Sequence, residues 1–412
     1  MLKEIKKSSR DLAHRLLQCL VVAIRPLQVE ELVEVLAVDF DDSEGIPKLN
    51  ASWRWEDHEQ ALLLSCSSLI SIVEPDADND VSDHRTRVVQ FSHFSVKEFL
   101  TSPRLASPSR DVSLYHIVLE PAHVIMAQAC LAVLLRLDEG AGNDGTQNSS
   151  PLATYAATHW VAHAHFQSVS SQVRNSMECF FDPKGPSFAA WLQLYDMDTL
   201  NHIPSFKFFV SGRKSCGNSL YYAALCGFQG LVEHLITKHP DHAKAIGGFY
   251  QTAAVAALAG RHFELARLLH LNGSSVDPPG SGGATPLYSA AYTGDREMVQ
   301  GLLGCKADIN SQNENGTTPL MMASAEANPQ TLPMVRLLLE NGADPNVEDD
   351  DGMTSLHVAV YAGSLDVVRL LLEHGANVEP GVGVVRTPFQ IASEKGHHDV
   401  AKLLSEHGAK PI

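Results

Sequence analysis

An internal repeat of about 33 residues is the feature that most constrains how this chain folds. The four clearest copies are 284–294 (ATPLYSAAYTG), 317–327 (TTPLMMASAEA), 353–363 (MTSLHVAVYAG) and 386–396 (RTPFQIASEKG). The fourth position of each copy is Leu or Phe, and these positions are 33, 36 and 33 residues apart. Two weaker copies place Leu220 and Ala253 in the same register. One unit of this length cannot bury its apolar stripe alone, so about six copies predict an α-solenoid over 217–412.

The residues at the edges of each copy predict a pair of helices. Thr285, Thr318 and Thr387 can cap a helix, and each is followed by a proline, which fits the first helical position because its missing N–H would be unbonded there anyway. Gly342 and Gly375 follow the second apolar segment and can adopt the left-handed conformation that ends a helix. The whole chain is therefore predicted to be mainly α-helical.

The period, the T-P-L-H-like starts and the G-A-D-like ends resemble the ankyrin repeat across 217–412. The resemblance implies a protein-binding surface made by turn tips and exposed first-helix positions on the concave face. Carried over by register, the expected partner-binding residues are Tyr222, Tyr292, Thr293, Met322, Glu326, Met353, Val358, Tyr361, Glu394 and Lys395. For Val358, packing on the neighbouring repeat is an equal alternative. His357 is expected to join one repeat to the next.

The first 110 residues follow a winged-helix plan. Helices are expected over 10–23, over 25–39 beginning at Pro26, and over 53–70. The segments 69–74 (LISIVE) and 87–95 (RVVQFSHFS) flank a polar turn and predict a β-hairpin. Residues 111–200 are expected to form a helical region that leads to the repeats, in which an apolar helix over 123–137 is buried.

Several phrases of this half resemble a known family: CSSLISIVE (66–74), VVQFSHFSVKEFLTS (88–102), LATYAATHWVAHAHF (152–166) and FAAWLQLYDMD (188–198). They look like the region that follows the NACHT ATPase in fungal NACHT–ankyrin proteins, which are NOD-like signalling ATPases of the STAND class. In that family the winged helix is a conformational latch against the ATPase. The sequence contains no G-x-x-x-x-G-K-[ST] phosphate loop, so the resemblance gives no ATP site. Two alternatives stay open: a natural ATPase-less relative, or a fragment of a signal-transducing ATPase whose ATP-binding module lies upstream of Met1.

The net charge of −17 argues against nucleic-acid binding. Both halves are acidic, whereas non-specific binding to nucleic acid requires Lys and Arg to neutralise phosphates. The helix expected to read DNA in a winged helix carries Glu30, Glu31 and Glu34, which would repel the backbone. A protein partner, possibly basic, is expected instead.

The remaining motifs indicate a non-enzymatic, cytoplasmic protein. The seven cysteines are scattered without a C-x-x-C, which is typical of a reducing compartment, and no apolar run reaches membrane-spanning length. His159, His163 and His165 could suggest zinc, but a structural role is favoured because no further ligand is evident. No catalytic signature and no cofactor motif is found. The expected function is protein–protein interaction in a NOD-like signalling context.

Overall fold

The structure is a computed structural model that forms two compact units, Met1–Met197 (unit 1) and Asp198–Ile412 (unit 2). It describes residues 5, 10–40, 46–50, 66, 68–74, 87–106, 113–137, 150–195, 197, 217–325, 331–379 and 386–410. No helix within these ranges is both long and apolar enough to cross a membrane.

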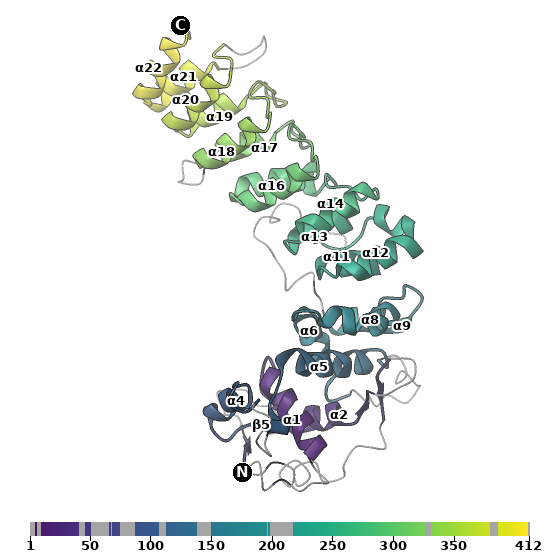
Figure 1. Ribbon diagram of the computed structural model, residues 1–412. Coiled ribbons are helices and arrows are strands. Elements are labelled where there is room, and N and C mark those ends of the chain that lie inside the picture. The colour runs from purple at the N-terminus through teal and green to yellow at the C-terminus, as the bar shows by residue number, and fades with distance from the viewer. Residues whose placement is uncertain are drawn as a thin grey trace. The chain divides into compact units, whose positions relative to one another are not determined.

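Unit 1 begins with a winged-helix arrangement (Figure 1). Its elements are α1 (Arg10–Val22), β1 (Leu27–Gln28), α2 (Val29–Leu36), β2 (Val38–Asp39), β3 (Lys48–Leu49), β4 (Ile70–Val73), β5 (Val88–Phe91) and α4 (Phe94–Leu100). An antiparallel sheet has the order β1-β5-β4, with Leu27 opposite Val89 and Ile72 opposite the same Val89. The predicted hairpin is confirmed as β4 and β5.

Two expectations for the helix at 25–39 are wrong. Pro26 does not begin it, because Leu27 and Gln28 pair with β5 and the helix starts at Val29. The helix also ends at Leu36, since Val38 and Asp39 form a short antiparallel ladder with β3. Most of the helix expected over 53–70 lies outside the described residues.

The rest of unit 1 is helical and packs on the winged helix. It comprises the short 3₁₀ turn Ser113–Tyr115 and the helices α5 (Leu119–Leu134), α6 (Ala153–Ala164), α7 (Val169–Gln172), α8 (Arg174–Phe180) and α9 (Pro186–Leu194). As predicted, α5 is largely buried, and it packs against α1 and α6. Trp160, Phe180, Phe181 and Trp191 form an aromatic cluster whose ring centroids lie 5.4–6.2 Å apart.

Unit 2 consists of helix pairs stacked one on another, from teal to yellow in Figure 1. The pairs are α11 (Ser219–Leu225) with α12 (Gln229–Lys238), α13 (Ala253–Ala259) with α14 (Phe263–Leu271), α15 (Pro286–Thr293) with α16 (Arg296–Gly304), α17 (Pro319–Ser324) with α18 (Thr331–Glu340), α19 (Ser355–Tyr361) with α20 (Leu365–Glu373), and α21 (Pro388–Lys395) with α22 (His398–Glu406). Successive first helices lie side by side at α15–α17, α17–α19 and α19–α21. These pairs match the six copies of the sequence repeat.

The predicted helix ends of unit 2 are confirmed. Thr285, Thr318 and Thr387 cap α15, α17 and α21, accepting backbone N–H bonds at 3.2–3.3 Å. Gly363 adopts φ +68° after α19, where a Cβ atom would lie only 2.6 Å from the ring of His397 in the next repeat. Both the left-handed backbone and the close approach of the His397 side chain therefore favour glycine at this position.

Candidate functional site

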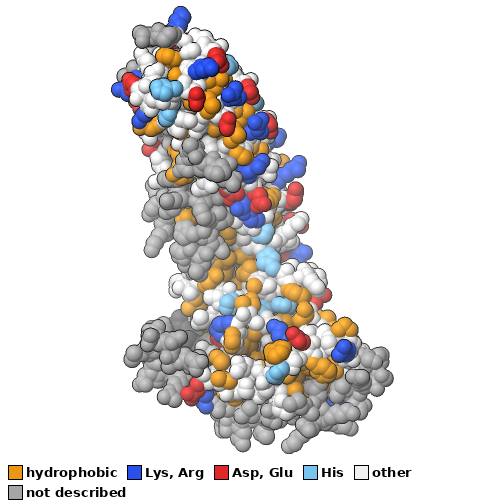
Figure 2. Space-filling view, turned by 90° about the vertical axis from the view of Figure 1, so that its left-hand side faces the viewer, with side chains coloured by type: hydrophobic (Ala, Val, Ile, Leu, Met, Phe, Trp, Pro, Cys, Tyr) orange, Lys and Arg blue, Asp and Glu red, His pale blue; other side chains and the backbone are white. Residues whose placement is uncertain are grey.

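The first and second helices of the repeats differ in charge. Helices α11, α13, α15, α17 and α19 contain no Asp, Glu, Lys or Arg, whereas every second helix carries both signs. Figure 2 shows that the Lys and Arg side chains on the visible face of the repeats are interspersed with Asp and Glu. The first helices of the first five repeats thus contribute no charged side chain, whereas α21 carries Glu394 and Lys395.

These uncharged first helices are accessible only from the third repeat onward. All residues of α11 and α13 are buried, and Tyr222 on α11 is only 3% exposed. This burial gives no support to the expectation that Tyr222 contacts a partner; its ring lies edge-on to Tyr221. Of the other expected residues, Tyr292, Thr293, Met322, Met353 and Val358 are half-buried, Tyr361, Glu394 and Lys395 are exposed, and Glu326 lies outside the described residues.

Tyr361 is the most exposed aromatic side chain at these positions, at 59%. The Lys395 ammonium lies 3.9 Å from its ring centroid, so a cation–π contact joins α19 to α21. Glu394 forms a 2.8 Å ion pair with Arg386, and both side chains are more than half exposed. Such an exposed pair contributes little to stability. The structure thus brings Tyr361, Glu394 and Lys395 together on adjacent repeats; we call these three residues with Arg386 the Tyr361 cluster.

An acidic turn precedes α19. Asp349 is used locally, since its carboxylate accepts the backbone N–H groups of Asp351 and Met353 at 3.1 and 2.8 Å. Glu348, Asp350 and Asp351 are exposed. No group of three or more possible metal ligands occurs in the described part of the chain, in this turn or elsewhere. The turn therefore presents three solvated carboxylates beside the first helices.

His357 has a structural role. It is fully buried on α19, and its Nδ1 atom accepts the backbone N–H of Thr354 at 3.0 Å, which closes a capping box. Burial lowers the pKa of His357 to about 4, against the opposing effects of the Glu348 carboxylate and the Arg386 backbone. Because Arg386 belongs to the next repeat, His357 faces the junction between two repeats, as expected.

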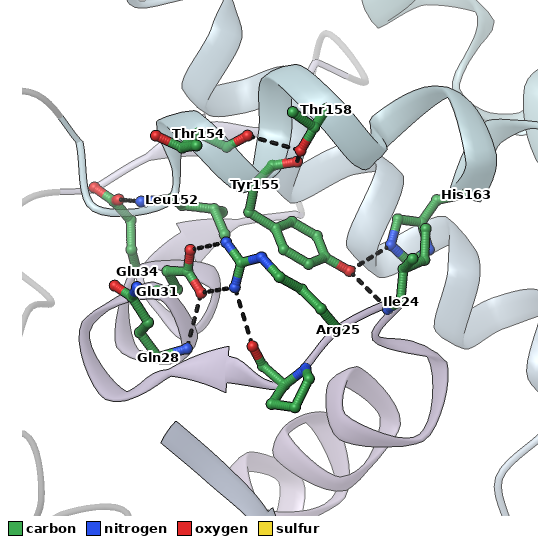
Figure 3. Close-up of polar contacts among 11 residues, drawn as sticks. Ile24, Arg25, Gln28, Glu31, Glu34, Leu152, Thr154, Tyr155, Thr158 and His163 are labelled. Atoms are coloured by element: carbon green, nitrogen blue, oxygen red, sulfur yellow. Dashed lines mark hydrogen bonds and ion pairs between the residues drawn. The ribbon is translucent and has the colours of Figure 1, made fainter. Parts of the chain in front are cut away.

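Unit 1 contains a buried polar network that sequence reasoning missed (Figure 3). The Glu31 carboxylate, 1% exposed, accepts two bonds from the Arg25 guanidinium, at 2.5 and 2.8 Å, and the backbone N–H of Gln28 at 2.8 Å. Arg25 also lies 5.0 Å from the ring centroid of Tyr155 on α6. The bond to Glu31 raises the pKa of Arg25, so this buried carboxylate is compensated by a permanent positive charge.

A second buried carboxylate connects α2 to α6. Glu34, also 1% exposed, accepts the backbone N–H of Leu152 at 2.8 Å and the hydroxyl of Ser150. Leu152 is the N-cap residue of α6, so Glu34 supplies an acceptor to a helix N-terminus, where a negative charge is favourable.

These contacts bear on the expectation that α2 does not read DNA. Repulsion by Glu31 and Glu34 was expected, but both face inward, and seven of the eight residues of α2 are buried. A helix buried in this way presents little surface to a DNA groove. The sequence signal for this was that Glu31 and Glu34, spaced three apart, lie among the apolar residues of the helix, whereas Glu30 is exposed.

The three histidines of the zinc hypothesis do not converge on a metal site. His163 is fully buried, and its two ring nitrogens lie 2.9 Å from Tyr155 Oη and from His123 Nδ1. Burial, His123 and His159 together lower the pKa of His163 to about 3. His159 packs edge-on against Tyr155, and His165 is exposed. The structural role favoured for His163 fits these contacts.

Comparison with known families agrees with this architecture. A model of ankyrin repeats matches residues 220–313, 290–381 and 327–412, and a model described as the winged helix domain of GPI inositol-deacylase matches residues 2–109. The protein is thus mainly helical, with a winged-helix domain at its N-terminus and ankyrin repeats in its C-terminal half. The ankyrin repeats support a role in protein interaction.

Several curated proteins are similar to this chain. Azaphilone pigments biosynthesis cluster protein L of Monascus ruber is 26% identical over 271 residues, covering 64% of this chain and 55% of that protein. E3 ubiquitin-protein ligase KEG of Arabidopsis thaliana is 36% identical over 83 residues, covering 20% and 5%. Putative ankyrin repeat protein L86 of Acanthamoeba polyphaga mimivirus is 45% identical over 75 residues, covering 18% and 13%. The chain spans about half of the first of these relatives and far less of the other two.

Proposed function

We propose that this protein is a non-enzymatic, cytoplasmic interaction protein whose ankyrin array binds a protein partner across the first helices of the third to sixth repeats, on the concave face. The observation that carries the proposal is the uncharged row of first helices, which ends at the exposed Tyr361. A surface without charges is inexpensive to desolvate, and a tyrosine supplies apolar area together with one hydroxyl.

The acidic turn before α19 indicates the character of the partner. Glu348, Asp350 and Asp351 are exposed beside the uncharged row, and the segment 341–354 contains no Lys or Arg. Complementary charge accelerates association and weakens as salt screens it. A partner with Lys or Arg next to an apolar segment would match both parts of the surface.

The test is quantitative capture of binding proteins by the full chain, from lysate of cells that express it. Truncating an aromatic anchor costs about 2 kcal/mol or more, roughly a 30-fold increase in Kd. We expect Tyr292→Ala combined with Tyr361→Ala to abolish capture of a specific protein. Arg369→Ala on the second helix α20 is the matched control and should leave capture intact. Equal capture by the double variant and the wild type would refute the proposed surface.

We also place this interaction in NOD-like signalling, with the array acting as ligand sensor or autoinhibitor. The match of residues 2–109 to a winged-helix domain supports this context. In either form of the proposal, ATPase-less relative or part of a NACHT-type ATPase, the purified chain should neither bind nor hydrolyse ATP. Hydrolysis by the purified chain would contradict both, and an in-frame phosphate loop in the coding sequence upstream of Met1 would favour the second form.

Buried thiols support the cytoplasmic location. Cys19, Cys66, Cys130 and Cys305 are buried, and none of these four forms a disulfide with another described residue. Burial raises the pKa of the Cys19 and Cys66 thiols to about 12, which keeps them protonated and unreactive. Fractionation of cells that express the full chain would test the location, and recovery in a membrane or secreted fraction would contradict it.

A further inference from the structure

A chain of hydrogen bonds runs from the half-buried His123 into the core of unit 1. His123 Nδ1, on α5, lies 2.9 Å from His163 Nδ1, on α6, and His163 Nε2 lies 2.9 Å from Tyr155 Oη. The backbone N–H of Ile24 donates to the same Oη at 3.2 Å. Figure 3 shows Tyr155 Oη between His163 and Ile24, which lies in the turn joining α1 to β1. Tyr155 and His163 are both fully buried.

When both histidines are neutral, every hydrogen bond in this series can be donated in the same direction, from Ile24 towards His123. Tyr155 Oη accepts the proton of Ile24 N–H and donates its own to His163 Nε2. His163 then carries its hydrogen on Nδ1 and donates it to the lone pair of His123 Nδ1. His123 keeps its single hydrogen on Nε2. Each described donor and acceptor along the chain is satisfied in this arrangement.

A proton from water that binds His123 must go to Nδ1, because Nε2 is already occupied. Two N–H groups would then face each other across 2.9 Å. The conflict is relieved when the hydrogen of His163 moves, by exchange with water, from Nδ1 to Nε2. His163 Nε2–H then donates to Tyr155 Oη, which leaves the hydroxyl hydrogen of Tyr155 without the acceptor it had. A buried hydroxyl that loses its acceptor weakens the local structure.

We propose that His123, His163 and Tyr155 form an acid-sensitive switch that controls the turn between α1 and β1. Protonation of His123 reverses the direction of the chain and weakens the hold of Tyr155 on Ile24 N–H. The same turn contains Arg25, which contacts the Tyr155 ring and pairs with Glu31, so loosening it affects the start of α2.

The surroundings decide where the first proton binds. Burial and the charge of Lys97 lower the pKa of His123, but His163 is wholly buried and its pKa is lowered to about 3. The half-buried His123 therefore takes the proton first. The ring of Phe166 stacks on His123. The titratable and charged groups around the hydrogen bonds from His123 to Ile24 are Lys97 on α4, Cys130 on α5, His159 on α6, Cys19 on α1, Arg25 in the turn and Glu31 on α2.

Amide hydrogen exchange of the full chain tests the switch. The protection of Ile24 N–H, corrected for intrinsic exchange, is compared at about pH 7.5 and about pH 4, because the pKa of His123 is lowered from the ordinary histidine value. We expect a roughly tenfold or larger loss of protection at the lower pH in the wild type. In His123→Gln the loss should vanish, because the neutral amide can occupy the position of the imidazole. Tyr155→Phe should leave Ile24 weakly protected at both pH values.

His165→Gln is the matched control. This exposed histidine is not part of the series of hydrogen bonds from His123 to Ile24, so the variant should behave as the wild type does. Nitrogen chemical shifts of the imidazoles give a second readout that requires no substitution. The hydrogen of His163 should move from Nδ1 to Nε2 with the same midpoint as the titration of His123. Protection of Ile24 that is independent of pH, a loss that persists in His123→Gln, or a His163 tautomer that does not change would each overturn the proposal.

Discussion

Removal of the Glu34 carboxylate tests whether this buried charge fixes α6 to the winged helix. In Glu34→Ala the backbone N–H of Leu152 loses its 2.8 Å acceptor inside the protein. Hydrogen bonds to charged groups contribute about 1.5–3 kcal/mol, and a lost helix cap costs about 1 kcal/mol. We therefore expect the free energy of unfolding of unit 1 to fall by about 3 kcal/mol. Glu34→Gln, which keeps an acceptor oxygen, should lose only about 1 kcal/mol.

Tryptophan fluorescence during chemical denaturation isolates this effect. The chain has four tryptophans, and all of them lie between residues 53 and 191, so the signal reports unit 1 without unit 2. Glu30→Ala is the control, because Glu30 lies on the same helix but is exposed and should lose under about 1 kcal/mol. A loss in Glu34→Ala below about 0.5 kcal/mol, or one equal to that of Glu30→Ala, would refute the reasoning.

Three further outcomes are expected. Gly363→Ala should lower the thermal stability of the repeats by about 2 kcal/mol or more, measured by far-ultraviolet circular dichroism. Gly304→Ala is the control and should change this stability by under about 1 kcal/mol, because Gly304 has a right-handed backbone and a Cβ atom there would meet no atom within 4 Å. The pKa of His357 is lowered to about 4 from about 6.5 in the unfolded chain, so the repeats lose stability as the pH falls from about 6.5 towards 4. About 2 kcal/mol of the free energy of unfolding should be lost between about pH 7 and about pH 5. His357→Gln should make the free energy of unfolding less dependent on pH in this range. Arg25→Met should destabilise unit 1 by about 3–5 kcal/mol by tryptophan fluorescence, because it leaves the Glu31 carboxylate buried without its partner, and an unchanged midpoint would contradict the assigned pairing.

The repeats were predictable because their determinants are local. A threonine before a proline fixes the start of α15, α17 and α21, and a glycine in the left-handed region ends α15 and α21. These signals act within a few residues and recur in several of the copies. The hairpin of β4 and β5 was predictable for a similar reason, since two apolar segments flank one polar turn.

Long-range pairing accounts for what the sequence did not reveal. Pro26 has the signature of a helix start, but Leu27 pairs as a strand with Val89, more than sixty residues away. Because of this pairing, the helix begins only at Val29. The inward direction of Glu31 and Glu34 likewise depends on Arg25 and on the start of α6. Tyr222 has the register of a surface residue, yet it is only 3% exposed.

Hydrogen-bonded residues are much farther apart in the sequence in unit 1 than in the repeats, so the two units differ in when their contacts can form during folding. In unit 1, Ile24 bonds to Tyr155 across 131 residues, and Leu152 bonds to Glu34 across 118. In the repeats, Arg261 meets Asp295 across only 34 residues. Closing long loops slows folding, whereas contacts between neighbouring repeats form as soon as each one is made. During synthesis the winged helix leaves the ribosome before α6, and the acceptor role of Glu34 is fulfilled only after α6 has followed it, so unit 1 depends on protection from aggregation for longer than a single repeat does.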